Sequence, residues 1–156
     1  MLGPHRVRSN AEENRMSIDL VRNAPKTPAR TASIKSMEYS MRGDAKAWLD
    51  LFADDAIVQD PYGPSPMNPN GQGHHGKAAI EKFCAAYIQP DRIRFEVRQT
   101  LTSGPACVNV GTIFAKGFDG RFAWNEVINV YEVNAAGKIT LLRSYWDYEA
   151  NQKTAF

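Results

Sequence analysis

Cysteines and long apolar runs are scarce in this chain. The first shortage argues against a disulfide-stabilised protein, and the second argues against a membrane-spanning one. Its 156 residues include two cysteines, Cys84 and Cys107, without C-x-x-C spacing, which are too few for a disulfide framework. No apolar run approaches the roughly 18 residues that a membrane span needs. The N-terminus also lacks the continuous apolar stretch of a secretory signal. We therefore expect a cytoplasmic protein with no membrane span.

A strong excess of one charge is also missing, since the formal net charge is +2. Residues 1–30 carry six basic and three acidic residues, whereas the other 126 carry 13 basic and 14 acidic ones. This nearly neutral remainder has no basic stripe of the kind that a phosphate backbone requires, so we expect no nucleic-acid partner. What is present is an ordinary globular composition, 43% hydrophobic and 23% charged, which suffices for one domain with a core.

The composition changes near residue 28. Residues 1–28 are polar, basic and interrupted by three prolines, so they have little apolar surface to bury and are predicted to form a flexible tail. Met16 lies where a translation start would fit, a hypothesis that N-terminal sequencing of the native protein tests. We predict one domain over residues 29–150 and a C-terminal tail over residues 151–156.

Helix signals come first along the chain and strand signals follow. Thr27 and Pro28 predict a helix start and Gly43 predicts its end, while Asp44 predicts the cap of a second helix. After Pro90 the apolar pattern has period two, with tight turns, which predicts antiparallel strands. The predicted helices cover residues 28–42, 45–52 and 77–88, and the predicted strands cover residues 56–60, 93–97, 107–116, 121–133 and 139–148. This order indicates an α+β fold, in which a curved, mostly antiparallel sheet and three N-terminal helices form a cone around an apolar pocket.

Asp60 is the first residue that points to chemistry. It ends the apolar segment Ala-Ile-Val-Gln-Asp and precedes Pro61, and strand alternation places it on the same face as Ala56 and Val58. If that face lines the core, desolvation raises the pKa of the carboxyl and makes it a usable general base near neutral pH. If the strand end is solvated, Asp60 only opens a proline-rich turn. The pattern alone leaves both interpretations open.

Two amides and a group of aromatic residues mark the last two predicted strands. Asn125 and Asn129 recur on one face with Val127 and Tyr131. Buried amides need hydrogen-bond partners, so these two either satisfy neighbouring polar groups or donate to a ligand oxygen. The aromatic side chains suit core packing or a flat apolar ligand. They are Trp124, Tyr131, Tyr145, Trp146 and Tyr148.

Residues 71–76, Gly-Gln-Gly-His-His-Gly, match the G-x-G-x-x-G pattern of dinucleotide-binding proteins. That motif requires a strand running directly into the glycines within a βαβ unit, whereas the predicted strand here ends at Asp60 and a loop intervenes. Glycines in a loop before a helix explain the pattern better. His74 and His75 are adjacent and have no Cys/His cluster beside them, so neither a metal site nor a cofactor is predicted.

A longer stretch of the chain resembles a known family. Residues 43–44 (Gly-Asp) and 51–63 (Leu-Phe-Ala-Asp-Asp-Ala-Ile-Val-Gln-Asp-Pro-Tyr-Gly) are similar to the ketosteroid isomerase signature. Residues 76–83 resemble that family's next helix and residues 134–139 its last hairpin. The resemblance implies the cone-shaped α+β fold of the nuclear transport factor 2 superfamily. It is less specific for activity, since relatives include SnoaL-like cyclases, dehydratases, epoxide hydrolases and non-catalytic binders.

In ketosteroid isomerases an aspartate shuttles a proton between the carbons that flank a dienolate, while a tyrosine and a protonated aspartate donate hydrogen bonds to the oxyanion. The resemblance places the base at Asp60 and the protonated aspartate at Asn129, whose amide still donates. The tyrosine position falls on Ser36, which is too short to replace it, and a second family tyrosine falls on Cys84. Three other tyrosines are candidates for the missing hydroxyl: Tyr39, Tyr62 and Tyr145.

These features predict a steroid delta-isomerase-like enzyme in which Asp60 abstracts a proton next to a ketone and Asn129 holds the enolate oxygen. The alternatives are a non-catalytic binder of steroid-like or other apolar molecules, a SnoaL-like cyclase or dehydratase, and a pure interaction module. We expect a homodimer in each case, with no cofactor or metal. The predicted loop over residues 64–75 is longer than in the short isomerases. The candidate substrate-binding residues are Ser36, Tyr39, Phe83, Cys84, Phe114, Trp124 and Trp146.

Overall fold

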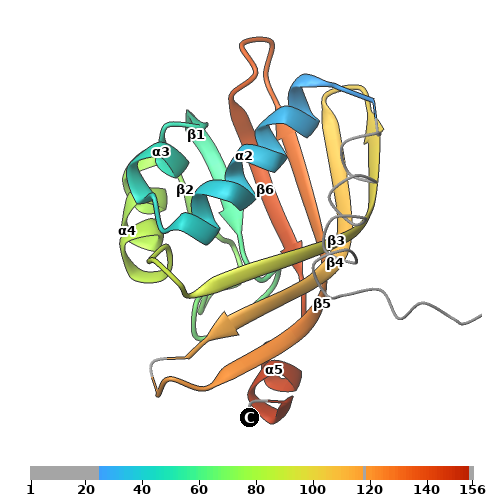
Figure 1. The fold of residues 1–156 in the computed structure, drawn as a ribbon. Helices are drawn as coiled ribbons and strands as arrows, with labels where there is room; N and C mark the ends of the chain where they lie inside the picture. Colours follow the sequence, from blue (N-terminus) through green and yellow to red (C-terminus); the bar gives the residue numbers. More distant parts are fainter. Residues whose placement is uncertain (1–24, 118, 155–156) are drawn as a thin grey trace, which may run out of the picture.

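A curved six-stranded sheet with helices packed on one face makes up the protein (Figure 1). The computed structural model describes residues 25–117 and 119–154, so most of the predicted N-terminal tail, with Met16, lies outside the described residues. The strand order is β2-β1-β6-β5-β4-β3, and all neighbours are antiparallel except the parallel pair β1 and β6. The α+β fold with a mostly antiparallel sheet is therefore confirmed. The elements are α2 (Pro28–Arg42), α3 (Ala45–Leu49), β1 (Phe52–Gln59), β2 (His74–His75), α4 (Lys77–Tyr87), β3 (Ile93–Ser103), β4 (Ala106–Lys116), β5 (Phe122–Val133), β6 (Ile139–Tyr145) and α5 (Tyr148–Thr154).

Local signals define α2, the helix that crosses the inner face of the sheet (Figure 1). The Thr27 side chain accepts a hydrogen bond from the Arg30 backbone N–H at 3.1 Å, and Pro28 occupies the first turn, where its missing N–H costs nothing. Gly43 ends the helix with a φ of 68°, a left-handed conformation that glycine adopts without strain. Asp44 then caps α3. The predicted start and end of the first helix are thus confirmed.

The second helix is shorter than predicted, and the first strand begins earlier. α3 ends at Leu49 and β1 begins at Phe52, four residues before the predicted start at Ala56. Phe52 pairs with Ile139 of β6 and is 1% exposed. The prediction was wrong here because pairing with a strand from the far end of the chain outweighs the local helical pattern.

The last strand is also shorter than predicted, and a helix follows it. β6 ends at Tyr145 instead of Tyr148, and α5 begins at Tyr148. The Asp147 side chain accepts a hydrogen bond from the Ala150 backbone N–H at 3.0 Å, which caps this helix. The run of aromatic residues favoured a strand in the prediction, whereas the capping aspartate was the signal for a helix.

The core lies between the inner face of the sheet and helices α2, α3 and α4. Trp48 of α3 is 1% exposed, and its ring centroid lies 4.4 Å from that of Phe52. Strand β5 alternates strictly between buried and exposed side chains over most of its length. Its inner, buried side chains are Ala123, Asn125, Val127, Asn129, Tyr131 and Val133. The predicted common face of Asn125, Asn129 and Tyr131 is therefore confirmed, and it faces the core.

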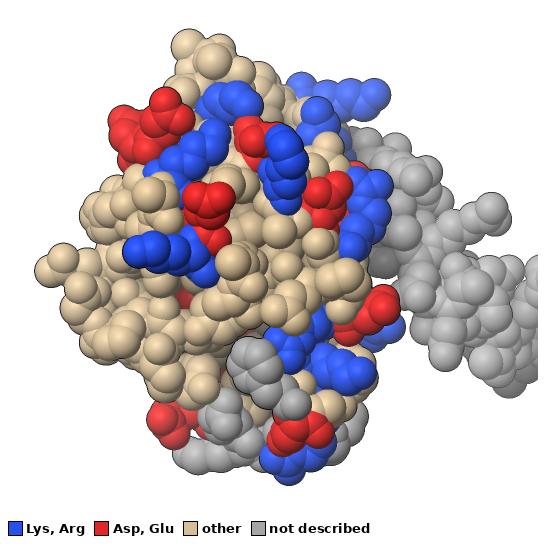
Figure 2. Space-filling view, turned by 90° about the vertical axis from the view of Figure 1, so that its left-hand side faces the viewer, with Lys and Arg blue, Asp and Glu red and all other residues tan. Residues whose placement is uncertain are grey.

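Charges of both signs are interspersed on the side of the molecule that carries α3 and α4, with no large area of one sign (Figure 2). Lys46 and Asp50 form an exposed ion pair there at 2.8 Å, and such pairs contribute about 0–1 kcal/mol. Among the described residues, no helix is both long enough and apolar enough to span a membrane.

Candidate active site

A cavity of about 160 Å³ lies between the inner face of the sheet and the helices. This volume is close to that of a cavity of about 150 Å³ that accepts benzene, so it suits one ring of a larger ligand. Most of its wall is apolar, and its rim includes the exposed residues Lys116 and Gly117. The polar side chains inside are Ser36, Ser40, Asp60, Asn129, Tyr131 and Ser144.

Asp60 lines this cavity directly after the last residue of β1, so the structure favours the first of its two interpretations. Burial raises the pKa of its carboxyl. The Trp146 indole, which donates to Asp60 Oδ1 at 2.6 Å, acts in the opposite direction, as do the Ser144 hydroxyl and His74. The carboxyl is thus desolvated and at the same time held in one orientation by a hydrogen bond.

The parallel pairing of β1 with β6 explains why Trp146 reaches Asp60. Gln59 at the end of β1 lies opposite Arg143 of β6, and parallel strands end at the same edge of a sheet. The residues that follow both strands therefore meet. Asp60 and Trp146 are 86 positions apart in the sequence, and no local pattern brings them together.

Asn129 enters the same cavity from β5, where it lies opposite Ser144 of β6. Its side chain is buried, with 4% exposure. Because β1, β6 and β5 are neighbouring strands, the carboxyl of Asp60 and the amide of Asn129 belong to one wall of the cavity. Asn125 is buried on the same face of β5 but does not line the cavity.

Ser36 belongs to a hydrogen-bond cluster that the sequence did not predict. Its Oγ lies 2.9 Å from the Trp48 indole nitrogen and 3.2 Å from the Tyr131 hydroxyl. All three side chains line the cavity and are almost completely buried. Burial raises the pKa of Tyr131, and the negative charge of Asp60 raises it further. The signal for Tyr131 was present in the sequence, since it shares the inner face of β5 with Asn129.

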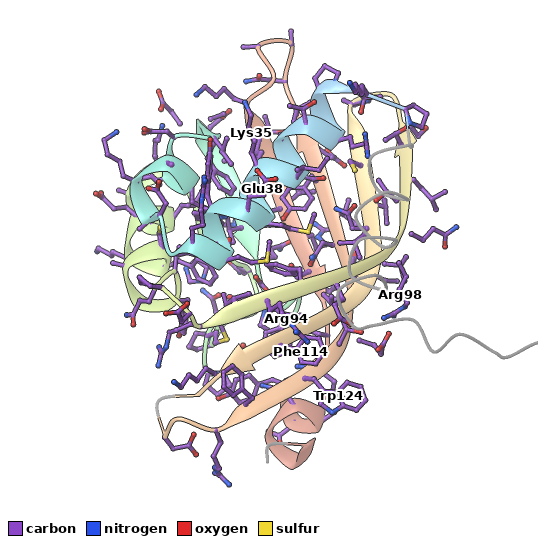
Figure 3. The ribbon with its side chains drawn as sticks, in the orientation of Figure 1. Lys35, Glu38, Arg94, Arg98, Phe114 and Trp124 are labelled. Atoms are coloured by element: carbon purple, nitrogen blue, oxygen red, sulfur yellow. The ribbon has the colours of Figure 1, made fainter. Side chains whose placement is uncertain are left out.

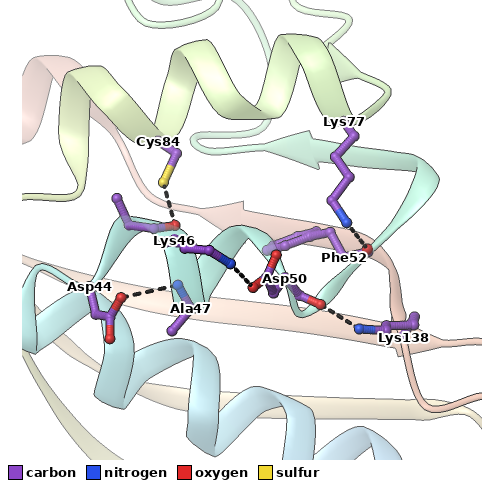
Figure 4. Close-up of polar contacts among 9 residues, drawn as sticks. Asp44, Lys46, Ala47, Asp50, Phe52, Lys77, Cys84 and Lys138 are labelled. Carbon is purple, nitrogen blue, oxygen red and sulfur yellow. Dashed lines mark hydrogen bonds and ion pairs between the residues drawn. The ribbon is translucent and has the colours of Figure 1, made fainter.

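Phe83 and Trp146, two of the predicted substrate-binding residues, line the cavity as Ser36 does. Their contact with a ligand stays a prediction. Cys84 does not line it, because its thiol points to α3 and donates to the Ala45 carbonyl at 3.3 Å (Figure 4). Burial raises the pKa of Cys84 to about 11, so it remains a thiol at neutral pH.

Phe114 and Trp124 were wrongly assigned to the pocket. They lie opposite each other on β4 and β5, on the outer face of the sheet (Figure 3). Trp124 is 40% exposed, and the Arg94 guanidinium lies 4.3 Å from the centre of the Phe114 ring. Strand alternation places Trp124 and Asn125 on opposite faces of the sheet. The prediction assigned Trp124 to the pocket because it gave more weight to the aromatic side chain than to this alternation.

None of the three tyrosines predicted to supply the missing hydroxyl lines the cavity. Tyr39 lies on α2 beside Arg42, whose guanidinium is 5.0 Å from the centre of its ring. Tyr62 and Tyr145 are exposed by 52% and 42%, and their rings contact each other with a centroid distance of 5.3 Å. Tyr87, Tyr131 and Tyr148 line it instead, and Tyr131 is the most deeply buried of the three, with 2% exposure.

The glycine-rich loop has a structural explanation. His74 and His75 form β2, which pairs antiparallel with β1, so no strand runs into these glycines. Gly73 has a φ of 87°, and a Cβ there would lie 2.7 Å from the Val58 carbonyl oxygen. Each imidazole Nε2 contacts a backbone carbonyl of the same loop. Within residues 25–117 and 119–154, no group of three His, Cys, Asp or Glu side chains is placed to hold a metal ion.

Comparison with known proteins places this geometry in a family. The SnoaL-like domain family matches residues 35–142, which is more than half of the chain. A solved structure of Delta 5-3-ketosteroid isomerase from Mycobacterium sp. is 32% identical, with a TM-score of 0.74, and the match covers 84% of this chain and 98% of that one. RV0760c from Mycobacterium tuberculosis is 30% identical, with a TM-score of 0.73 and coverage of 81% and 96%.

Two further similar structures concern steroid ligands. RV0760c has also been solved in complex with estradiol-17beta-hemisuccinate, and this structure is 31% identical, with a TM-score of 0.74 and coverage of 80% and 97%. A computationally designed 17-OHP binder is 31% identical, with a TM-score of 0.75 and coverage of 80% and 95%. The sheet topology, the cavity and these matches agree, and the chain belongs to the SnoaL-like domain family of the nuclear transport factor 2-like superfamily.

Proposed function

We propose that this chain is a steroid delta-isomerase-like enzyme, an intramolecular oxidoreductase that shifts a double bond by proton transfer next to a ketone. Asp60 is the general base. The observation that carries the proposal is a carboxyl in a mainly apolar cavity, where burial raises its pKa. A carboxyl whose pKa is raised toward the working pH is a better proton acceptor while it is still ionised.

The reaction needs one base and a donor for the enolate oxygen. Asp60 removes a proton from the carbon between the ketone and the double bond, and the electron pair delocalises onto the ketone oxygen. Asn129, whose amide carries two N–H donors, stabilises this oxygen. Asp60 then returns the proton to the far end of the dienolate. The substrate is isomerised without net oxidation, and Trp146 keeps the carboxylate oriented throughout.

A non-catalytic binder of apolar molecules is the second candidate. Ser36, where the ketosteroid isomerases carry their tyrosine, favours it, and so does the similarity to the designed 17-OHP binder. Such a binder would fill the same cavity without turnover. A SnoaL-like cyclase or dehydratase would use Asp60 on another substrate.

A homodimer is part of the proposal. Large contiguous apolar surfaces mark protein–protein contacts, and the proposed contact area is the outer face of the sheet. It carries four exposed large apolar side chains: Leu101, Phe122, Trp124 and Ile128. A second copy of this chain packed on that face would cover them. Sedimentation as a monomer at micromolar concentration would count against this part of the proposal.

The test is turnover of a β,γ-unsaturated 3-ketosteroid, followed by the absorbance of the conjugated enone. Asp60→Asn is expected to lower kcat by about 10²–10⁴, the usual contribution of a general base, while steroid binding measured by tryptophan fluorescence is retained. Asp55→Asn, which alters an exposed carboxylate on β1, the strand that directly precedes Asp60, is the matched control. Binding without any turnover would reject the isomerase and leave the binder.

A further inference from the structure

The Trp48 indole and the hydroxyls of Ser36 and Tyr131 form a hydrogen-bond cluster in the cavity. Together these groups carry one more donor proton than the hydrogen bonds between them require. The Trp48 indole nitrogen and the Tyr131 hydroxyl both contact Ser36 Oγ, at 2.9 and 3.2 Å. The indole N–H can only donate, whereas each hydroxyl has one proton to donate and lone pairs to accept. Three donor protons are therefore available, and the two contacts consume two of them.

One O–H of this cluster is left for an acceptor outside it. In the part of the chain that the structure describes, the side-chain oxygens of Ser36 and Tyr131 have hydrogen-bond partners only within the cluster. Both residues line the cavity and are 1% and 2% exposed. Because a buried donor without an acceptor is costly, the remaining O–H is available to a polar atom that enters the cavity.

We propose that Tyr131 donates this O–H to the carbonyl oxygen of the ligand, and so supplies the hydroxyl that the family tyrosine position lacks at Ser36. This inference rests on the proposed isomerase function. Without a ligand, the Trp48 indole and the Tyr131 hydroxyl both donate to Ser36 Oγ. When the ligand oxygen enters, the Tyr131 O–H turns to it, and the Ser36 O–H, which is not used between these groups, donates to Tyr131 in its place. Each donation polarises the next hydroxyl and strengthens its bond. Tyr131 is the catalytic residue in this arrangement, and Ser36 and Trp48 are positioning residues.

The place of Tyr131 in the sheet fits this role. It lies two residues beyond Asn129 on the same inner face of β5, so their backbones are about 7 Å apart. Both side chains line the same cavity, so in this proposal one ligand oxygen accepts a hydrogen bond from each. Burial and the charge of Asp60 raise the pKa of Tyr131, so its hydroxyl keeps its proton across the neutral range. The ligand class that this arrangement recognises is an apolar ring system with one ketone or phenol oxygen.

Turnover gives the first test. Tyr131→Phe is expected to lower kcat by about 10²–10³, the cost of losing one oxyanion donor, with little change in KM. Ser36→Ala should lower kcat less, because Tyr131 is still present, and Ser36→Thr should restore it, because the hydroxyl remains. An unchanged kcat in Tyr131→Phe, or a Ser36→Thr variant as slow as Ser36→Ala, would overturn the assignment.

Binding gives a second test that does not depend on turnover. Asp60→Asn removes the negative charge that would repel an anion, and 4-nitrophenolate then serves as the oxyanion mimic. Adding Tyr131→Phe to this variant is expected to weaken 4-nitrophenolate binding by about tenfold or more. Nitrobenzene has the same ring and nitro group but lacks the phenolate oxygen. Its binding should stay nearly unchanged, which would show that the cavity is intact.

The two tests separate this inference from the proposed function. Equal weakening of both ligands, or no weakening of 4-nitrophenolate, would overturn the role of Tyr131 even if the protein is an isomerase. Selective loss of 4-nitrophenolate binding supports the role of Tyr131 even if no steroid is turned over. In that case the isomerase is rejected, and the donor belongs to a binding site for phenols and ketones.

Discussion

Replacing Asp60 with Asn removes the proposed base, and we expect the variant to be more stable than the wild type at neutral pH. Burial raises the pKa of Asp60 above its ordinary value of 3.8 in the folded protein. The folded state therefore binds a proton at pH values at which the unfolded chain has already lost it. The free energy of unfolding of the wild type falls as the pH rises from 3.8 through the folded-state pKa, and it stays reduced above that pKa.

The size of this stability change depends on two effects of the carboxamide: it keeps a hydrogen bond with Trp146, and it removes a buried charge. The Trp146 N–H still finds an acceptor, but the bond changes from charge-assisted, worth about 1.5–3 kcal/mol, to neutral, worth about 0.5–1.5 kcal/mol. Desolvation of the carboxylate is the largest influence on its pKa and outweighs the favourable contacts. We expect a net gain of about 0.5–2 kcal/mol at neutral pH, as is common when a functional residue is replaced. This corresponds to a rise in Tm of about 2–8 °C.

The assay is urea unfolding of both proteins at pH values from about 4 to about 8. The stability difference between Asp60→Asn and the wild type should be smallest at the acid end and should widen as the pH rises. Asp55→Asn, at the exposed position on β1, should show no widening difference. A variant less stable than the wild type at neutral pH, or a difference that is independent of pH, would refute the reasoning.

Three further predictions concern other parts of the structure. Trp146→Phe removes the N–H that favours the ionised form of Asp60, so the pKa of Asp60 should rise and the acid limb of the pH profile of kcat/KM should move to higher pH. Phe83→Ala enlarges the cavity and should lower the free energy of unfolding by about 3–5 kcal/mol in urea titrations. Thr27→Ala removes the cap of α2 and should cost about 1 kcal/mol in the same assay, with no change in KM for the steroid.

Local features could be predicted from the sequence where neighbouring residues determine them. Thr27, Pro28 and Gly43 act within a few positions of each other, so they define α2 without help from the rest of the chain. The inner face of β5 could be predicted for the same reason, since alternation along a strand depends only on the strand itself. Asp60 could be singled out because its position at the end of an apolar strand is a local pattern, but that pattern left its burial open, and the family resemblance supplied its expected role.

The remaining features depend on residues that are far apart in the sequence. Tyr131 and Ser36 are 95 positions apart, and no spacing rule connects a helix residue to a strand residue at that distance. β1 begins at Phe52 because β6 pairs with it, which a helical pattern around residue 50 conceals. The assignment of Trp124 to the pocket failed for a different reason, because an aromatic residue was weighted above its place in the alternation.

The parallel pairing of β1 with β6 also has a consequence for the kinetics of refolding. The hairpins of β3, β4 and β5 join neighbouring segments, whereas β1 and β6 are separated by most of the domain, and such non-local pairings are slow to form. Until β6 docks, Asp60 is an ordinary solvated carboxylate. Refolding at a pH slightly above 3.8 therefore takes up a proton when the two strands meet. In a weakly buffered refolding experiment, a pH indicator dye would follow this proton uptake. Its rate would report when β6 pairs with β1 and Asp60 becomes buried in the cavity.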